Sequence, residues 1–300
     1  MFQRWTRRAS ILMLLAGCTG AIDRGGGPGA GGGPDDKGTG GKGNPLPPLG
    51  PDPMATGACK TPTPGPSPLR RLSRAEYANT VVELFGAQAA DAVNFIREAR
   101  VNGFDNNAQS RAVSNLLAQE YFETAEKVST AAVGKLSDLI GCDPAAQGEP
   151  ACLDRFLDGF GKRVWRRPLE PAERDSLKQV FTQGRTAAFA DGIQAVLQVM
   201  LLSPQFMYRL EKGVPVTGAS YLRLDPYEMA SRLSYLLWGS MPDAALFAAA
   251  DAGKLSTREE VKAQAQRMLG DPRTARMVST FTNEWLRLDE IGDIEKQAEP

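Results

Sequence analysis

The chain has 300 residues, its 35 lysines and arginines balance its 35 aspartates and glutamates, and it contains no histidine. Zero net charge without a basic tract disfavours nucleic-acid binding. The missing histidine removes the commonest general base, the commonest metal ligand and the Cys-x-x-Cys-His haem attachment site. No P-loop, Rossmann glycine pattern or zinc-type cysteine spacing occurs either. We therefore expect no cofactor, no haem and no metal site in this chain.

Residues 1–17 are predicted to be a lipoprotein signal peptide. Three arginines precede a short apolar run over residues 11–15, which is too short to span a bilayer. The tetrapeptide at 15–18, LAGC, resembles a bacterial lipobox, which implies cleavage before Cys18 and attachment of palmitate-type acyl chains to the protein. An ordinary signal peptide with a chance cysteine is the alternative. Thr19 rather than Asp follows the cysteine, and by resemblance to bacterial lipoproteins this implies a lipid-anchored protein of the outer membrane in the cell envelope.

Residues 18–68 are predicted to be a disordered linker. About half of the residues after Cys18 in this segment are Gly or Pro, far above ordinary usage. Such a segment lacks the apolar surface that would offset its ordering entropy, and its root-mean-square reach is on the order of 40 Å. Cys59 lies here, either as a free thiol or as a partner for a cysteine outside this chain.

The remaining residues are predicted to form an all-α, multi-helix, bundle-like body in three domains, 69–140, 150–212 and 219–300. Helical spacing of apolar residues recurs and period-two alternation is rare. Capping boxes are predicted at Ser73/Glu76, Asp225/Glu228 and Ser256/Glu259. The predicted helices run from Arg74 to Gly86, from 115 to 139, from 153 to 165, from Pro171 onward, from 193 to 202, from 226 to 238, from Asp243 to Gly253, from Ser256 to Gly270 and from Pro272 through Leu288.

The apolar face of these helices supplies the predicted core. We expect the helix from 193 to 202, which is apolar all round, to lie deep in the body. Trp165, Trp238 and Trp285 are predicted to be core residues, with a carbohydrate-binding platform as the alternative. The predicted buried positions of the long helix are Leu116, Leu117, Phe122 and Val128. In the helix from 226 to 238, apolar residues recur at helical spacing, at Met229, Leu233, Leu236 and Leu237.

Cys142 and Cys152 flank a loop that contains Pro and Gly. In an exported protein this spacing predicts a local disulfide, with two free thiols as the alternative.

The stretch from Asp225 to Asp243 contains the main candidate site. Arg232 interrupts the apolar pattern, and Asp225, Glu228 and Asp243 are the nearest acidic residues in the sequence. We predict a structural arginine that joins helix ends through charge-assisted hydrogen bonds. The alternative is an anion- or sugar-binding arginine in a cleft beside Trp238.

Two further polar groups have a structural and a functional interpretation. Asp105, Asn106 and Asn107 favour a turn, although their oxygens could bind calcium outside any EF-hand spacing. The arginine pairs at 70–71 and 166–167 favour helix-terminal salt bridges, with phosphate or carboxylate binding as the alternative.

Several motifs resemble three families of unknown function. The motifs, in chain order, are LRRLSRAEYANT (69–80) and GFDNN (103–107), then RVWRRPL (163–169) and LSPQF (202–206), then ASRLSY (230–235), WGSMPD (238–243) and RMLGDPR (267–273). They are similar to domain-of-unknown-function families 1587, 1595 and 1592, a planctomycete-type, cytochrome-associated group that also occurs in myxobacterial lipoproteins. The resemblance implies that the third domain is truncated at its C-terminal end, and it carries over no catalytic residue.

We expect a membrane-anchored interaction or scaffold protein of an extracytoplasmic redox or polymer-processing system. Its partners would be the membrane and proteins of the cell envelope, a cytochrome among the candidates. One alternative is a hydrolase that acts on a polysaccharide or another polymer through Asp/Glu residues, and a second is an electron-transfer protein with haem on a missing segment or partner. No catalytic motif is recognisable, which leaves enzyme activity undecided and disfavoured.

Overall fold

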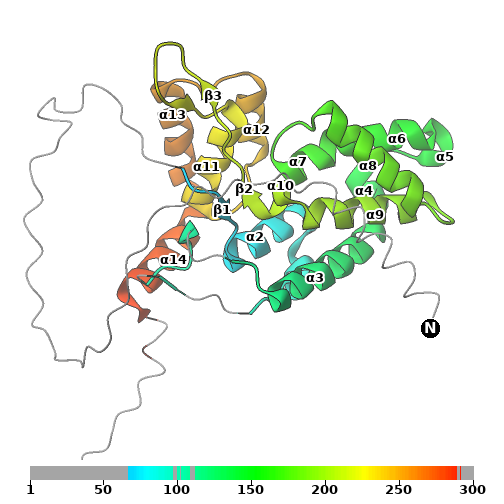
Figure 1. Cartoon of the computed structure of the whole chain (residues 1–300), viewed down its shortest axis with the longest axis horizontal. Helices are drawn as coiled ribbons and strands as arrows, with labels where there is room; N and C mark the ends of the chain where they lie inside the picture. The colour runs from blue at the N-terminus through cyan, green and yellow to red at the C-terminus, as the bar shows by residue number, and fades with distance from the viewer. Residues whose placement is uncertain (1–66, 97–99, 102, 109–111, 289–290, 292–300) are drawn as a thin grey trace, which may run out of the picture. The chain divides into compact units, whose positions relative to one another are not determined.

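The computed structural model describes residues 67–96, 100–101, 103–108, 112–288 and 291 (Figure 1). The predicted signal peptide, Cys18, the linker and Cys59 lie outside these residues. The described residues all fall within one compact unit. Among them, no helix combines the length and the apolar character that crossing a membrane requires.

The described chain is all-α, as predicted, with two short antiparallel strand pairs. The helices are α2 (Arg74–Phe85), the 3₁₀ helix η2 (Ala87–Ala92), α3 (Asn115–Val133), α4 (Leu136–Ile140), α5 (Pro144–Gln147), α6 (Glu149–Phe156), the π-helical turn η4 (Leu157–Gly161), α7 (Lys162–Trp165), α8 (Pro171–Gly184), α9 (Phe189–Leu202), α10 (Pro204–Met207), α11 (Pro226–Trp238), α12 (Ala244–Asp251), α13 (Arg258–Leu269) and α14 (Thr274–Leu286). The strands are β1 (Arg70–Arg71) paired with β2 (Tyr208–Arg209), and β3 (Val214–Pro215) paired with β4 (Leu222–Arg223).

Capping residues set most helix starts where the sequence places them. Ser73 and Asp225 close capping boxes at the starts of α2 and α11, and Gly239 ends α11 in the left-handed conformation. One predicted box is wrong by one residue, because Thr257 and Glu260 cap α13 instead of Ser256 and Glu259. These caps depend on groups within four residues of one another, so local sequence largely determines them.

Two predicted helices are interrupted. The helix predicted over 115–139 divides into α3 and α4 around Gly134, where the chain makes a turn. The helix predicted over 153–165 starts earlier, at Glu149, and contains the π-helical turn η4 before α7. A π-turn inserts one residue per turn, which rotates the residues after it relative to those before it.

The core comprises two hydrophobic clusters. The larger one joins α2, α3, α4 and the helices from α6 to α10, and it includes Tyr235 of α11 and Phe247 of α12. The smaller one joins α11, α12 and α13. The prediction that the 193–202 segment lies deep is confirmed, since Ile193, Leu197 and Met200 in α9 are fully buried. Trp165 and Trp238 are core residues as predicted.

Two predicted core positions, Leu116 and Trp285, are wrong, and Leu236 of the apolar pattern in α11 is also exposed. Leu116, Leu236 and Trp285 are 53%, 61% and 64% exposed. Leu116 lies about 100° around α3 from Leu117, which takes the inward position and is buried. Helical periodicity identifies an apolar stripe, but neighbouring helices decide which edge of that stripe they cover.

The predicted disulfide is present between Cys142 and Cys152, whose Cα atoms lie 5.6 Å apart. It closes the short segment that contains α5. Loop closure of this length corresponds to about 2–3 kcal/mol of stabilisation.

Contacts far apart in sequence join the start of the described chain to its later parts. The Leu72 backbone N–H donates to the Met207 carbonyl oxygen at 2.8 Å beside the β1–β2 pair. The Thr80 and Tyr235 hydroxyl oxygens lie 2.8 Å apart and join α2 to α11. Figure 1 shows β1 and β2 paired beside α2 and α11.

Candidate functional site

Arg166 is a structural arginine at the end of α7. It is 4% exposed, and its Nη2 donates to the carbonyl oxygens of Gln205, Phe206 and Tyr208 at 2.7, 3.1 and 2.8 Å. Its guanidinium also lies 5.6 Å from the ring centroid of Tyr235. Arg166 has a φ of 60°, a left-handed conformation that glycine usually adopts at helix ends. The side-chain contacts therefore outweigh a backbone cost of about 1–3 kcal/mol.

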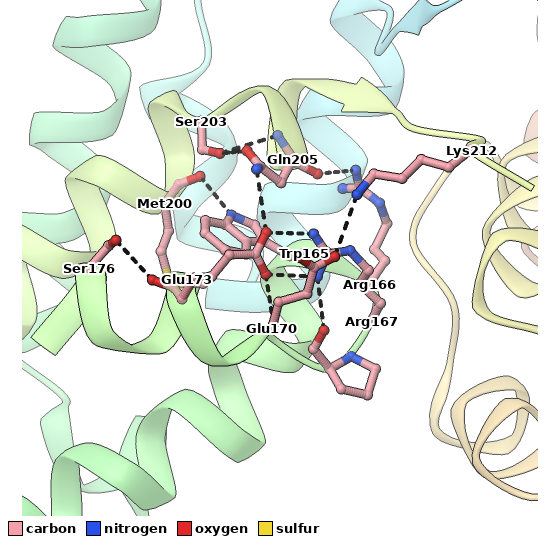
Figure 2. Close-up of polar contacts among 12 residues, drawn as sticks. Trp165, Arg166, Arg167, Glu170, Glu173, Ser176, Met200, Ser203, Gln205 and Lys212 are labelled. Atoms are coloured by element: carbon pink, nitrogen blue, oxygen red, sulfur yellow. Dashed lines mark hydrogen bonds and ion pairs between the residues drawn. The ribbon is translucent and has the colours of Figure 1, made fainter. Parts of the chain in front are cut away.

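Arg167 forms the predicted helix-terminal ion pair, with Glu173 (Figure 2). Its two terminal nitrogens donate to the two oxygens of Glu173 at 2.8 and 2.7 Å, and both side chains are half-buried. Glu173 also accepts from the Glu170 backbone N–H at 2.8 Å, at the start of α8. Burial raises the pKa of Glu173, but the hydrogen bonds from Arg167 and Glu170 outweigh it and hold that pKa below its usual value.

The five candidate residues around α11 lie in three different parts of the structure. Asp225 and Glu228 form the N-terminal cap, in which Asp225 accepts from the Tyr227 and Glu228 backbone N–H groups at 2.7 and 2.8 Å. The Glu228 carboxylate accepts from the backbone N–H groups of Asp225, Lys212 and Gly213. Both carboxylates are therefore occupied by backbone groups.

Asp243 and Trp238 belong to a second place, at the opposite end of α11. Asp243 caps α12 and accepts from Arg267 Nη1 at 2.8 Å. Trp238 is fully buried, and its Nε1 donates to the Met268 carbonyl oxygen at 3.1 Å. The Arg273 guanidinium lies 3.6 Å from the centroid of the Trp238 ring. Because protein groups surround this ring, Trp238 has no exposed face on which a sugar could stack.

Arg232 has a different partner from those predicted. Its Nε donates to Glu211 Oε1 at 2.9 Å, its Nη2 contacts Glu211 Oε2, and Ser67 Oγ also donates to Glu211 Oε2 at 2.7 Å. The predicted acidic partners were Asp225, Glu228 and Asp243, and Glu211 comes instead from the segment after β2. The side chain of Arg232 is 46% exposed, so this arginine lies at the edge of the body.

A cleft of about 770 Å³ runs along the exposed side of α11. Arg232 and the fully buried Trp238 are among its lining residues, whereas Asp225, Glu228 and Asp243 are not. The side chains that matter for its chemistry are Arg70, Glu76 and Asn79 near α2, Phe104 and Asp105 in the loop before α3, Arg209 and Glu211 near β2, Arg232 and Tyr235 in α11, and Arg276, Thr280, Phe281 and Glu284 in α14.

A carboxyl pair at one part of the cleft was not identified from the sequence. Glu284 is 6% exposed and shares a side-chain hydrogen bond with Asp105. Burial, followed by the charge of Asp105, raises the pKa of Glu284 to about 7, and Arg100 opposes this effect. No local signal points to the pair, because its members lie far apart in the sequence.

Gly103 permits the close approach that creates this pair. Its φ of 87° is unfavourable for residues with a side chain, and a Cβ here would lie 3.3 Å from the Glu284 carbonyl oxygen. Asp105 and Asn106 lie in a turn, as predicted. Within the described parts of the chain, no group of three or more His, Cys, Asp or Glu residues could hold a metal ion.

Three aromatic rings stack beside the cleft. The Phe104 and Phe281 ring centroids lie 6.0 Å apart, and those of Phe281 and Trp285 lie 5.8 Å apart. Phe281 is half exposed, in contrast to the buried rings of the core. This row attaches the loop before α3 to α14 and forms an apolar rim on the cleft.

The structure is a helical body with a large cleft that is assembled from distant segments of the chain. Three family models match the chain in order: a protein of unknown function (DUF1587) at residues 70–134, one (DUF1595) at 152–211, and one (DUF1592) at 224–300. The chain belongs to the proteins that carry these three domains of unknown function in this order, which confirms the resemblance of its motifs. Neither the curated proteins nor the solved structures include a match.

Proposed function

We propose that this protein is an exported, lipid-anchored binding module of the bacterial cell envelope, in which the three matched segments jointly form one ligand site. The observation that carries this proposal is the composition of the cleft. Asn79, Arg209 and Arg232 line it from the first, second and third matched segments, respectively. Its volume of about 770 Å³ is in the usual range for small-ligand sites.

Filling the cleft tests this proposal. Thr280 is exposed and lines the cleft, so Thr280→Trp should occupy part of it, and Thr182→Trp on α8 is the matched control on another surface. Wild-type protein is screened by thermal shift against oligosaccharides and small anions. We expect at least one ligand to raise the melting temperature of the wild type and the control, but not that of Thr280→Trp. A ligand-induced shift that persists in Thr280→Trp, or no shift in the wild type, would contradict a binding role for this cleft.

The lipid anchor is supported by the lipobox-like residues 15–18. Cys18→Ser should move the protein from the membrane fraction to the soluble fraction and abolish labelling by radioactive palmitate. Cys59→Ser removes the other cysteine of the first 68 residues and should change neither result. Retention of Cys18→Ser in the membrane fraction would exclude this mode of anchoring.

A hydrolase is the second candidate, and one observation favours it. The pKa of Glu284, about 7, means that this carboxyl could hold and donate a proton at neutral pH. Because Glu284 and Asp105 share a hydrogen bond, their carboxyl groups lie closer together than the roughly 5–10 Å that separates the two carboxyls of glycosidases. The arrangement instead resembles carboxyl pairs that share one proton.

Activity measurements decide between the two candidates. Under the hydrolase proposal, purified wild-type protein cleaves at least one polysaccharide or ester substrate. Glu284 protonates the leaving oxygen as water attacks, and the Glu284 carboxylate then takes the proton that the water loses. Glu284→Gln should then abolish cleavage, while Glu260→Gln, in the cap of α13, should retain it. If the wild type binds a ligand but cleaves no substrate, the hydrolase proposal is wrong and the binding module remains the proposed function.

A further inference from the structure

Two arginines lie opposite each other where β1 meets β2. Arg70 and Arg209 are direct partners in the antiparallel register, and both line the cleft. Residues directly opposite in such a pair place their side chains on the same face, and like charges there destabilise the pair. This arrangement has a cost in the absence of a ligand.

The carboxylates near these arginines have other partners. Glu211 binds Arg232 through both oxygens and accepts from Ser67, although the charge of Arg209 also contributes to lowering the pKa of Glu211. Glu76 accepts from the Ser73 backbone N–H at 2.7 Å in the capping box of α2. Within the described chain, no ion pair is formed by Arg70 or Arg209.

Arg209 is held in place before any ligand binds. Its guanidinium lies 5.5 Å from the ring centroid of Tyr235, which also contacts Arg166. A separate cavity of about 30 Å³ borders Arg209 and Arg166. It is large enough for one water, which could bond Arg209 Nε, a buried donor with no partner among the described residues. A side chain fixed in this way loses little entropy when it binds a ligand.

Along α14, the acidic part of the cleft lies apart from Arg276. Arg276 and Glu284 both line the cleft and are eight residues apart, which corresponds to about 12 Å of helix. The α14 wall therefore presents an arginine at one level and the Asp105–Glu284 pair at another. A ligand with an anionic group and a neutral, hydrogen-bonding remainder would complement both levels.

We propose that Arg70 and Arg209 form the subsite for an anionic group, a carboxylate or a phosphate, of the ligand that the cleft binds. This inference rests on the proposed binding function and names the chemistry of its ligand. Guanidinium groups bind both anions through paired, charge-assisted hydrogen bonds. A bound anion between the two side chains also relieves their mutual repulsion. Carboxylates of acidic polysaccharides and phosphate groups share this chemistry.

Calorimetric titration with defined probes tests the subsite. Trigalacturonate supplies carboxylates, inorganic phosphate supplies the other anion, and maltotriose is the neutral control. We expect the wild type to bind one of the two anions more weakly as salt increases. Arg70→Gln should weaken this binding by about tenfold or more, the equivalent of about 1.4 kcal/mol. Arg258→Gln, which removes an exposed arginine outside the cleft, should bind as the wild type does.

The thermal stability of Arg70→Gln separates binding from folding. Because this substitution removes one of two opposed charges, its melting temperature should equal or exceed that of the wild type. Unchanged anion binding in Arg70→Gln would overturn the subsite. Binding of maltotriose alone, blocked by Thr280→Trp, would overturn the anionic class of ligand and leave the cleft proposal intact. If none of these ligands binds even the wild type, both the anionic subsite and the binding function of the cleft are refuted.

Discussion

Arg166 contacts the Tyr235 ring and Arg232 lies three residues before Tyr235 in α11, but the two arginines have very different surroundings. Arg166 is almost fully buried and donates to three carbonyl oxygens, whereas the side chain of Arg232 is 46% exposed and binds one carboxylate. In the sequence both follow apolar residues at helical spacing and both favour a structural role. The comparison shows that burial and the number of fixed partners, more than sequence context, determine how much an arginine contributes to stability.

Removal of Arg166 should have the largest effect. Arg166→Met keeps much of the side-chain volume but leaves the carbonyl oxygens of Gln205, Phe206 and Tyr208 without their shared donor. We expect a loss of about 3–5 kcal/mol in the free energy of unfolding. Arg166→Lys should recover only part, because an ammonium group lacks the planar fork. Urea denaturation measures both variants, and a loss below about 1 kcal/mol would contradict the structural role.

Glu284 tests the opposite situation, a buried charge beside a like charge. Its pKa of about 7 in the folded protein exceeds the ordinary value of 4.5. The folded state therefore binds more protons than the unfolded state between pH 4.5 and 7, so this group's contribution to stability declines as pH rises through that range. We expect a decline of about 2 kcal/mol, discounted for water in the cleft.

Glu284→Gln removes this titration. Its urea stability should change less than that of the wild type between pH 4.5 and 7, and the variant should be the more stable protein at pH 8. Parallel profiles for the two proteins would exclude an elevated pKa at Glu284. Glu260→Gln is the control, because the pKa of Glu260 is lowered by hydrogen bonds from Thr257 and Ser256 and should not affect this range.

Arg167 and Glu173 should give an intermediate effect, because their bidentate pair is half-buried. We expect Arg167→Gln to lower the free energy of unfolding by about 1–2 kcal/mol. A double-mutant cycle with Glu173→Gln isolates the interaction from other effects of each change. A coupling energy near zero would mean that this pair stabilises the fold no more than an exposed ion pair does.

Arg232→Ala should have the smallest effect. A buried arginine would cost about 3–5 kcal/mol, but the exposure of Arg232 reduces the expected loss to about 0–1 kcal/mol. The effect should decrease further at high salt, unlike that of Arg166→Met. A loss as large as that of Arg166→Met would erase the distinction between the two arginines.

Local rules account for what could be predicted about the fold. Helix starts at Ser73 and Asp225, the end at Gly239 and the Cys142–Cys152 bridge all depend on groups within about ten residues of one another. Their partners are present in any conformation of the chain, so sequence spacing identifies them. The motif sets likewise identified three families in the correct order.

The sequence by itself therefore determined several helix caps, the disulfide and the family, while only the tertiary structure decided the candidate site. Arg232 binds Glu211 rather than a neighbour in α11, and the Asp105–Glu284 pair joins residues that only folding brings together. The exposure of Leu236 and Trp285 depended in the same way on which helices cover them. Charge pairing and burial act through space, so a pattern along the chain supplies candidates for a site without choosing among their partners.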